Sequence, residues 1–165
     1  MLPTAPLAVD VLGMKLKTAP FRHAEFLVGE EPLVSLDVSP DLLAAAELGE
    51  VDEAAFVDCI RTSLPYAWET ISLLVAEHAA GDSDRPFVDN QVPPPDEQAR
   101  GQLLRALASD AIRGSLERHF GVTLAFQNCH RVAVFAADAA GTEAYRRFTS
   151  PRAQLLNQSP VLRDC

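Results

Sequence analysis

A polar pentapeptide between two apolar runs is the part of this chain whose residue types could do chemistry. It separates Val122–Phe126 from Val132–Ala136 and consists of Gln127, Asn128, Cys129, His130 and Arg131. A thiol beside an imidazole and an amide has the composition of a cysteine nucleophile with a general base and an orienting group. Adjacent side chains of a strand point to opposite faces, so Cys129 and His130 could meet only in a tight turn. His119 or His78, each on a predicted helix, is a better-placed base.

The same pentapeptide has a structural interpretation, which we favour. Asn128 is a residue type that tolerates the left-handed turn conformation, and Cys129 is a small side chain that often fills buried space. We therefore expect a hairpin turn with its polar side chains facing outward, and a single long strand is the alternative. Candidate binding residues of this turn are Gln127, Asn128, His130 and Arg131, and weaker catalytic candidates are Cys129, His130 and His119.

Two aromatic residues after Pro65 are further binding candidates. Tyr66 and Trp68 could line a cleft at a proline kink, although large aromatics at helical spacing more commonly belong to a core. His119 precedes Phe120 at the end of a predicted helix, where the helix dipole favours a protonated imidazole. That position explains His119 without a catalytic role.

Arginines are concentrated in the second half of the chain. On the predicted helix that contains four of them, only Arg100 and Arg118 point in one direction, so they form no continuous stripe. Arg118 is retained as a binding candidate. A candidate basic rim around the hairpin consists of Arg131, Arg146, Arg147 and Arg152.

The composition is that of a globular protein with an uneven charge distribution. The chain has 165 residues, 48% of them hydrophobic, and a net charge of −9, which fits one domain with a core of its own. Residues 1–94 contain 16 acids and 5 bases, whereas residues 95–165 contain 7 acids and 9 bases. This asymmetry predicts an anionic face and an arginine-bearing face. The overall acidity disfavours duplex nucleic acid, whose binding depends on phosphate neutralisation.

Several functional classes lack their sequence signals. No apolar run is long enough to span a membrane, and no export signal is visible, so we expect a cytosolic protein. The odd, widely spaced cysteines Cys59, Cys129 and Cys165 predict neither a disulfide framework nor a zinc site. No phosphate loop, nucleotide fingerprint or metal motif occurs, and we expect neither a cofactor nor a metal.

The first half of the chain contains strand and helix signals in quick succession. Val34–Val38 alternates apolar and polar residues, a pattern that predicts a half-buried strand. Ser39 and Pro40 then predict the cap and first residue of a helix that ends at Leu48. A second helix starts near Asp52. Pro65 predicts either a kink or a division into two helices, with Ser63 capping the second.

The second half begins with a linker and contains the predicted hairpin. Residues 81–95 have the composition of a linker, and a third long helix is predicted from Glu97 to Phe120. After the hairpin, Thr142 and Ser150 predict the caps of two short helices. The expected fold class is α+β, with three main helices, a small antiparallel sheet that includes the hairpin, and short C-terminal helices.

The first 33 residues differ from the remainder. They contain four prolines and only weak strand alternation. The codons of Gly29-Glu30-Glu31 could spell a ribosome-binding sequence shortly before Val34, where translation could start. We expect residues 1–33 to be a non-native or poorly ordered extension, and residues 34–165 to form a single α+β domain.

Several segments resemble a small uncharacterised family from actinobacteria. They are VSLDVSP at residues 34–40, VDEAAFVDCIRTSLPYAW at 51–68, PPPDEQARGQLLRALASDAIRGSLERHFG at 93–121, LAFQNCHRVAVF at 124–135 and TSPRAQLLNQSPVLRDC at 149–165. The resemblance implies members of about 130 residues that begin at the equivalent of Val34, without an assigned activity or ligand. It also implies a gene neighbourhood shared with a mismatch-specific DNA endonuclease.

Three functional hypotheses from different classes follow. We favour a noncatalytic, acidic, cytosolic accessory or regulatory module that binds a protein partner or forms a homodimer. The second is a DNA-associated factor, because three helices followed by a hairpin is the element order of a winged helix. The third is a small cysteine-dependent enzyme that uses Cys129. The residues favour a noncatalytic protein over an enzyme.

Overall fold

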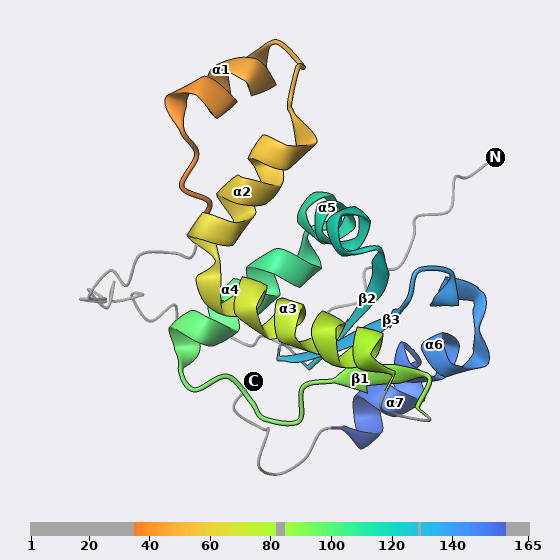
Figure 1. The fold of residues 1–165 in the computed structure, drawn as a ribbon. Helices are drawn as coiled ribbons and strands as arrows, with labels where there is room; N and C mark the ends of the chain where they lie inside the picture. The colour runs from red at the N-terminus through yellow and green to blue at the C-terminus, as the bar shows by residue number, and fades with distance from the viewer. Residues whose placement is uncertain (1–34, 82–84, 129, 158–165) are drawn as a thin grey trace, which may run out of the picture. The chain divides into compact units, whose positions relative to one another are not determined.

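The computed structural model describes residues 35–81, 85–128 and 130–157 and has the expected α+β fold (Figure 1). The predicted extension at residues 1–33 and the thiol of Cys129 lie outside the described residues. The elements are α1 (Pro40–Glu47), α2 (Glu53–Ser63), α3 (Pro65–Ala80), β1 (Phe87–Asp89), α4 (Glu97–Ala108), α5 (Asp110–Phe120), β2 (Val122–Gln127), β3 (Arg131–Ala136), the 3-10 turn η1 (Ala139–Gly141), α6 (Glu143–Phe148) and α7 (Pro151–Leu156).

Capping side chains start α1, α6 and α7 where the sequence predicts. The Ser39 hydroxyl accepts the N–H of Leu42 at 3.2 Å and begins α1, and Thr142 and Ser150 cap α6 and α7 in the same way. Pro65 divides the second predicted helix into α2 and α3. The predicted cap by Ser63 is wrong, because α3 has no side-chain cap and the Ser63 hydroxyl accepts the N–H of Asp37 at 2.8 Å.

Two further predictions are corrected by the structure. Residues 35–38 form no strand, because no segment among the described residues pairs with them, and of these four residues only Leu36 packs partly against the core. The predicted helix from Glu97 to Phe120 is two helices, since Ser109 is extended and its hydroxyl caps α5. A serine that can accept a backbone N–H competes with the continuing helix.

The sheet is antiparallel, with strand order β1-β3-β2. The predicted hairpin is confirmed as β2 and β3, which pair from Val122 with Ala136 to Gln127 with Arg131. Its turn residue Asn128 has a φ of 52°, the left-handed conformation that its type tolerates. The three-residue strand β1 lies in the predicted linker and pairs with β3.

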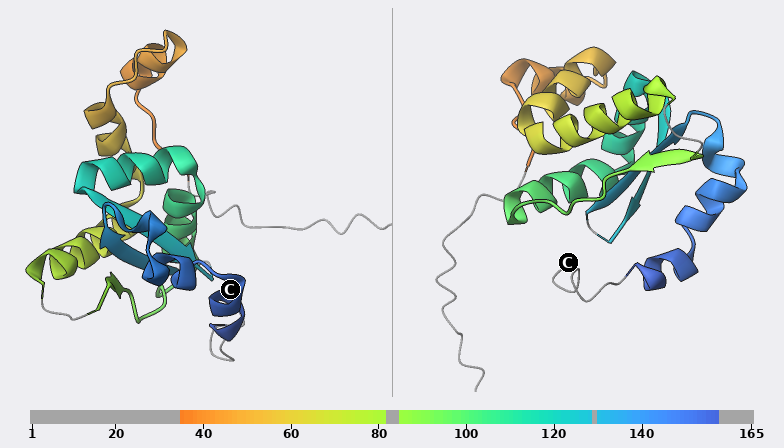
Figure 2. Two further views of the ribbon diagram at one scale, coloured as in Figure 1. Left: turned by 90° about the vertical axis from the view of Figure 1, so that its right-hand side faces the viewer. Right: turned by 60° about the horizontal axis from the view of Figure 1, so that its bottom comes forward.

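Helices cover both faces of this sheet (Figure 2). Alternate side chains of β3 point to opposite faces. Val132 and Val134 belong to the larger core cluster, to which α2, α3, α4 and α5 contribute. Ala133 and Phe135 belong to a second cluster with Phe148 of α6. On the face covered by α6, the polar end of the hairpin is held as well, because Gln127 at the end of β2 bonds to the carbonyl of Phe148.

Candidate functional site

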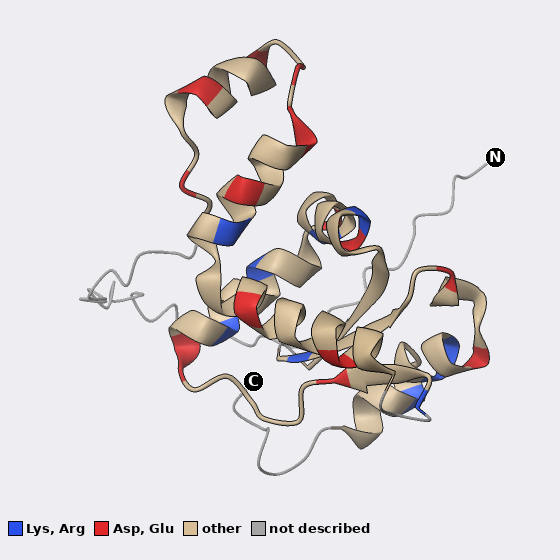
Figure 3. Ribbon diagram, in the orientation of Figure 1, with Lys and Arg blue, Asp and Glu red and all other residues tan. Residues whose placement is uncertain are grey.

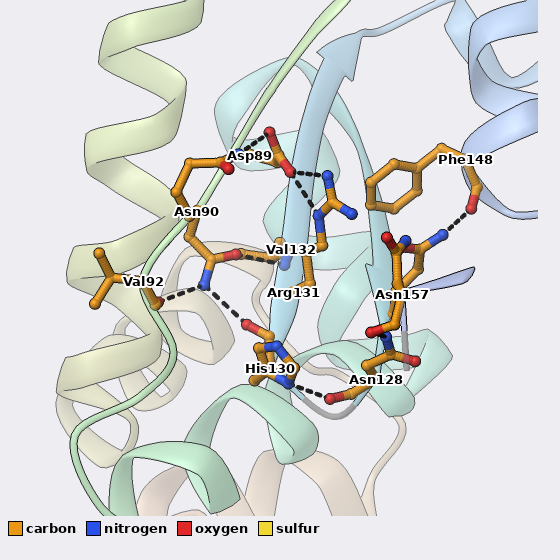
Figure 4. A network of polar contacts seen from close by, with 11 residues as sticks. Asp89, Asn90, Val92, Asn128, His130, Arg131, Val132, Phe148 and Asn157 are labelled. Carbon is orange, nitrogen blue, oxygen red and sulfur yellow. Dashed lines mark hydrogen bonds and ion pairs between the residues drawn. The ribbon is translucent and has the colours of Figure 1, made fainter. Parts of the chain in front are cut away.

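The predicted hairpin turn is packed against α7 rather than turned outward. The exposed fractions of Gln127, Asn128 and His130 are 3%, 7% and 4%, so the expectation that these side chains face solvent is wrong. The Gln127 amide donates to the carbonyl of Phe148 and accepts from the Asn157 amide at 2.6 Å (Figure 4). The Asn128 amide donates to the carbonyl of Asn157 at 3.0 Å. These amides fasten α6 and α7 to the end of the sheet.

His130 is buried beside the same turn. Its Nδ1 lies against the carbonyl oxygen of Asn128, and its own carbonyl accepts from the Asn90 amide at 2.9 Å. Burial lowers the pKa of His130, and the positive charges of Arg100 and Arg131 lower it further, against the contact with the Asn128 carbonyl. The neutral imidazole is therefore the favoured form in the folded protein.

Arg131 forms a partly buried ion pair with Asp89 of β1. The guanidinium lies 2.5 Å from the carboxylate, whose side chain is 4% exposed. The Gln91 amide donates to the other carboxylate oxygen at 2.7 Å, and the guanidinium lies 5.3 Å from the centre of the Phe148 ring. The charge of Arg131 is thus neutralised by Asp89 and helps to hold β1 on β3.

A cavity of about 560 Å³ adjoins Arg131 on the α6–α7 side of the sheet. We call it the arginine pocket. Its lining includes Arg85, Arg131, Arg147 and Arg152, together with Phe87, Gln127, Phe148, Ser150, Leu156 and Asn157. No acidic residue lines it among the described residues. The predicted basic rim is therefore partly assembled: three of its members line the pocket, whereas Arg146 pairs with Glu143.

A second hollow, of about 370 Å³, lies between α1 and α2 and is apolar. We call it the α1–α2 groove. Its lining consists of Val38, Leu42, Leu43, Ala46, Val51, Phe56 and Cys59. Val38, Leu43 and Val51 are 42%, 54% and 48% exposed. This groove could not be predicted from the sequence, because helical periodicity shows an apolar face without showing whether anything covers it.

The remaining predicted site residues, Tyr66, Trp68, Arg118 and His119, lie on α3 and α5. The Trp68 ring lies 5.3 Å from the His119 ring and 5.0 Å from that of Phe120, measured between centres. Arg118 of α5 pairs with Glu53 of α2 at 2.8 Å. The backbone N–H of Tyr66 donates to Gln102 at 2.7 Å. These contacts join helices, and none of them joins His119 to the hairpin turn.

A membrane-spanning helix and a metal-binding cluster are both absent from the described part of the chain. No helix there is long and apolar enough to cross a bilayer. No three histidine, cysteine, aspartate or glutamate side chains in residues 35–81, 85–128 and 130–157 gather to hold a metal ion.

Fold and surface together define a small α+β protein with an apolar groove and an arginine-lined pocket. A family model described as "NucS shadow ORF", labelled KH_NucS_shadow, matches residues 34–165. The chain belongs to this family, and the description states no activity, ligand or partner. No curated protein and no solved structure matches the chain.

Proposed function

We propose that this protein is a noncatalytic accessory module that binds a protein partner through the α1–α2 groove. The observation that carries the proposal is a wholly apolar lining, left uncovered by the described residues, beside exposed acids. Surface patches of this kind, apolar with a polar rim, are typical of interaction sites.

The physical state of α1 supports a partner. This helix has eight residues, and none of its side chains is buried. Isolated helices shorter than about 12 residues are only marginally stable in water, so most helices depend on packing of an apolar face. Leu42 and Leu43 would supply that face for α1 once a partner covers the groove.

Charge indicates what the partner looks like. Asp41, Glu47 and Glu50 are neighbours in sequence of groove residues, and each is exposed without an ion pair to a described residue. We infer an amphipathic helix with apolar residues on one face and lysine or arginine at its edges, a common mode of helix-in-groove recognition. A second copy of this chain fits less well, because two-fold pairing would bring the same acids together.

A binding assay with two designed peptides tests this proposal. One is an 18-residue amphipathic helix of leucine and lysine, and the other has glutamate in place of each lysine. We expect the wild-type protein to bind only the lysine peptide, and Leu43→Ser to weaken that binding at least tenfold. Leu73→Ser is the matched control, since Leu73 is 64% exposed on α3 and lies outside the groove lining.

Two results would overturn the proposal. One is equal weakening by Leu43→Ser and Leu73→Ser, and the other is a homodimer in sedimentation that Leu43→Ser converts to monomer. The second result would assign the groove to self-association.

Nucleic-acid binding is the second candidate, favoured by the KH label of the family model. KH modules clamp the nucleic-acid backbone with a GXXG loop. No two glycines in the 165 residues are three positions apart, and the net charge of −9 opposes phosphate contacts over an extended surface. The protein-binding role is therefore preferred.

The catalytic alternative receives little support from the contacts around the turn. Gln127, Asn128 and His130 are engaged in structural hydrogen bonds, and the His119 ring packs on Trp68. We also infer an actinobacterial origin and a cytosolic site of action. The excess of arginine over lysine and the widely spaced cysteines support these two inferences.

A further inference from the structure

The arginine pocket contains cations that form no ion pair with any described residue. Ten arginines lie in the described residues, and six of them pair with acids there: Arg61, Arg100, Arg113, Arg118, Arg131 and Arg146. The four arginines without such a partner among the described residues are Arg85, Arg105, Arg147 and Arg152. Three of these four, all except Arg105, line the arginine pocket.

This gathering has an energetic consequence. Like charges around one cavity repel each other, and the surrounding protein has ample acids that could neutralise them, as Asp89 neutralises Arg131. The described part of the chain places none of its acids in the pocket lining. An anion that entered the pocket would supply the missing negative charge.

We propose that the arginine pocket binds a small organic phosphate. Planar guanidinium groups match phosphate oxygens in paired hydrogen bonds, and several guanidiniums suit a doubly charged phosphate better than a singly charged carboxylate. The apolar part of the ligand would contact Phe87 and Leu156, which line the same cavity. The volume of about 560 Å³ lies within the usual range for small-molecule sites.

The elements that line the pocket explain how it is held open. Phe148 of α6 is fixed by Phe87 and Phe135, with ring centres 5.2 and 5.8 Å away. The Gln127 amide fixes the carbonyl of Phe148. Arg147 precedes Phe148, and Arg152 lies in the first turn of α7. The aromatic and amide contacts thus position at one cavity two cations that have no ion-pair partner among the described residues.

The overall negative charge of the protein does not prevent such binding. At physiological ionic strength, charges more than about 8 Å away are largely screened. The nearest charges therefore dominate at the pocket, and binding should weaken as salt is added. This site is separate from the α1–α2 groove, so the proposal does not depend on the protein-binding role.

Calorimetric titration of the full chain with adenosine monophosphate tests the proposal. We expect adenosine monophosphate to bind at micromolar to millimolar concentration, inorganic phosphate to compete, and adenosine to bind at least tenfold more weakly. Arg147→Ala and Arg152→Ala should each weaken binding at least tenfold. Both side chains are exposed, so the two variants should unfold at the same temperature as the wild type.

Arg105→Ala is the matched control, because Arg105 is exposed, lacks an ion pair with a described residue and lies outside the pocket lining. The proposal is overturned if adenosine monophosphate fails to bind at millimolar concentration, or if Arg105→Ala weakens binding as much as Arg147→Ala. A thymidine hexanucleotide without terminal phosphate forms a further arm. Tighter binding of this oligonucleotide, sensitive to Arg147→Ala, would assign the pocket to nucleic acid and overturn the small-ligand proposal.

Discussion

The α1–α2 groove and the arginine pocket differ in how they are built. The groove is apolar, and the short helix α1 beside it has no buried side chain. The pocket is fixed by aromatic packing, amide hydrogen bonds and an ion pair. In Figure 3, α1 shows acidic positions but no basic ones, whereas α6 has basic positions. Under the proposed roles, the groove would gain order when a partner binds, whereas the pocket is ordered beforehand.

The largest expected effect on stability is a difference between two arginines that line the same pocket. Arg131→Met leaves the buried carboxylate of Asp89 without its cation and should lower the free energy of unfolding by about 3 kcal/mol. Arg147→Met removes an exposed cation without a partner among the described residues and should change it by less than about 0.5 kcal/mol. Urea denaturation measures both.

A second substitution identifies the source of the Arg131 effect. Adding Asp89→Asn to Arg131→Met should recover part of the lost stability, because the uncompensated charge is gone. Equal losses of stability for Arg131→Met and Arg147→Met would contradict this account, in which only Arg131 stabilises the fold through an ion pair.

The amide contacts of the hairpin turn should give the next largest effect. Gln127→Ala leaves the Asn157 amide and the Phe148 carbonyl without their partner, which should cost about 1–3 kcal/mol. Hydrogen exchange should show faster opening of α7 than of α1 relative to the wild type. If exchange becomes faster only in α1, Gln127 does not hold α7 on the sheet.

Stability should depend on the protonation of His130. Its pKa in the folded protein is lowered from 6.5, so below pH 6.5 the unfolded chain binds a proton that the folded protein resists. The free energy of unfolding should fall as the pH drops through this range, by at most about 1.4 kcal/mol per pH unit from this group. Urea titrations of the wild type and His130→Asn at several pH values measure this pH dependence. If the free energy of unfolding changes equally with pH in both proteins, His130 is not its source.

The smallest expected effect comes from removing a serine cap, either from α5 in the core or from α1 beside the groove. Ser109→Ala removes the cap of α5, which has buried residues, and should cost about 1 kcal/mol of global stability. Ser39→Ala removes the equivalent cap of α1, which has none. Its loss should speed hydrogen exchange in α1 and leave the urea midpoint almost unchanged. A shifted midpoint for Ser39→Ala would mean that α1 is part of the cooperative core.

Local signals in the sequence predicted much of the fold, and long-range contacts account for what was missed. Ser39, Thr142 and Ser150 mark helix starts because a cap involves only its own turn. Strand β1 was missed because three residues in a proline-rich segment become a strand only by pairing with β3, about 45 positions later. The alternation at residues 34–38 predicted a strand wrongly for the converse reason, since no partner strand exists among the described residues.

The residues of the arginine pocket were likewise predictable only where they lie close together in the sequence. The basic rim could be proposed from Arg131, Arg147 and Arg152, which lie close in sequence to the hairpin. Arg85 was missed because only the pairing of β1 brings it to the pocket. The burial of Gln127 and His130 could not be read from a polar pentapeptide, because the segments that cover it come from elsewhere in the chain.

The most direct test of two independent binding surfaces is a crossed titration. Wild type, Leu43→Ser and Arg147→Ala are each titrated with the lysine peptide and with adenosine monophosphate. We predict that Leu43→Ser loses the peptide and keeps the nucleotide, and that Arg147→Ala does the reverse. If either substitution abolishes both interactions, or neither substitution affects its own ligand, the two-surface account is contradicted.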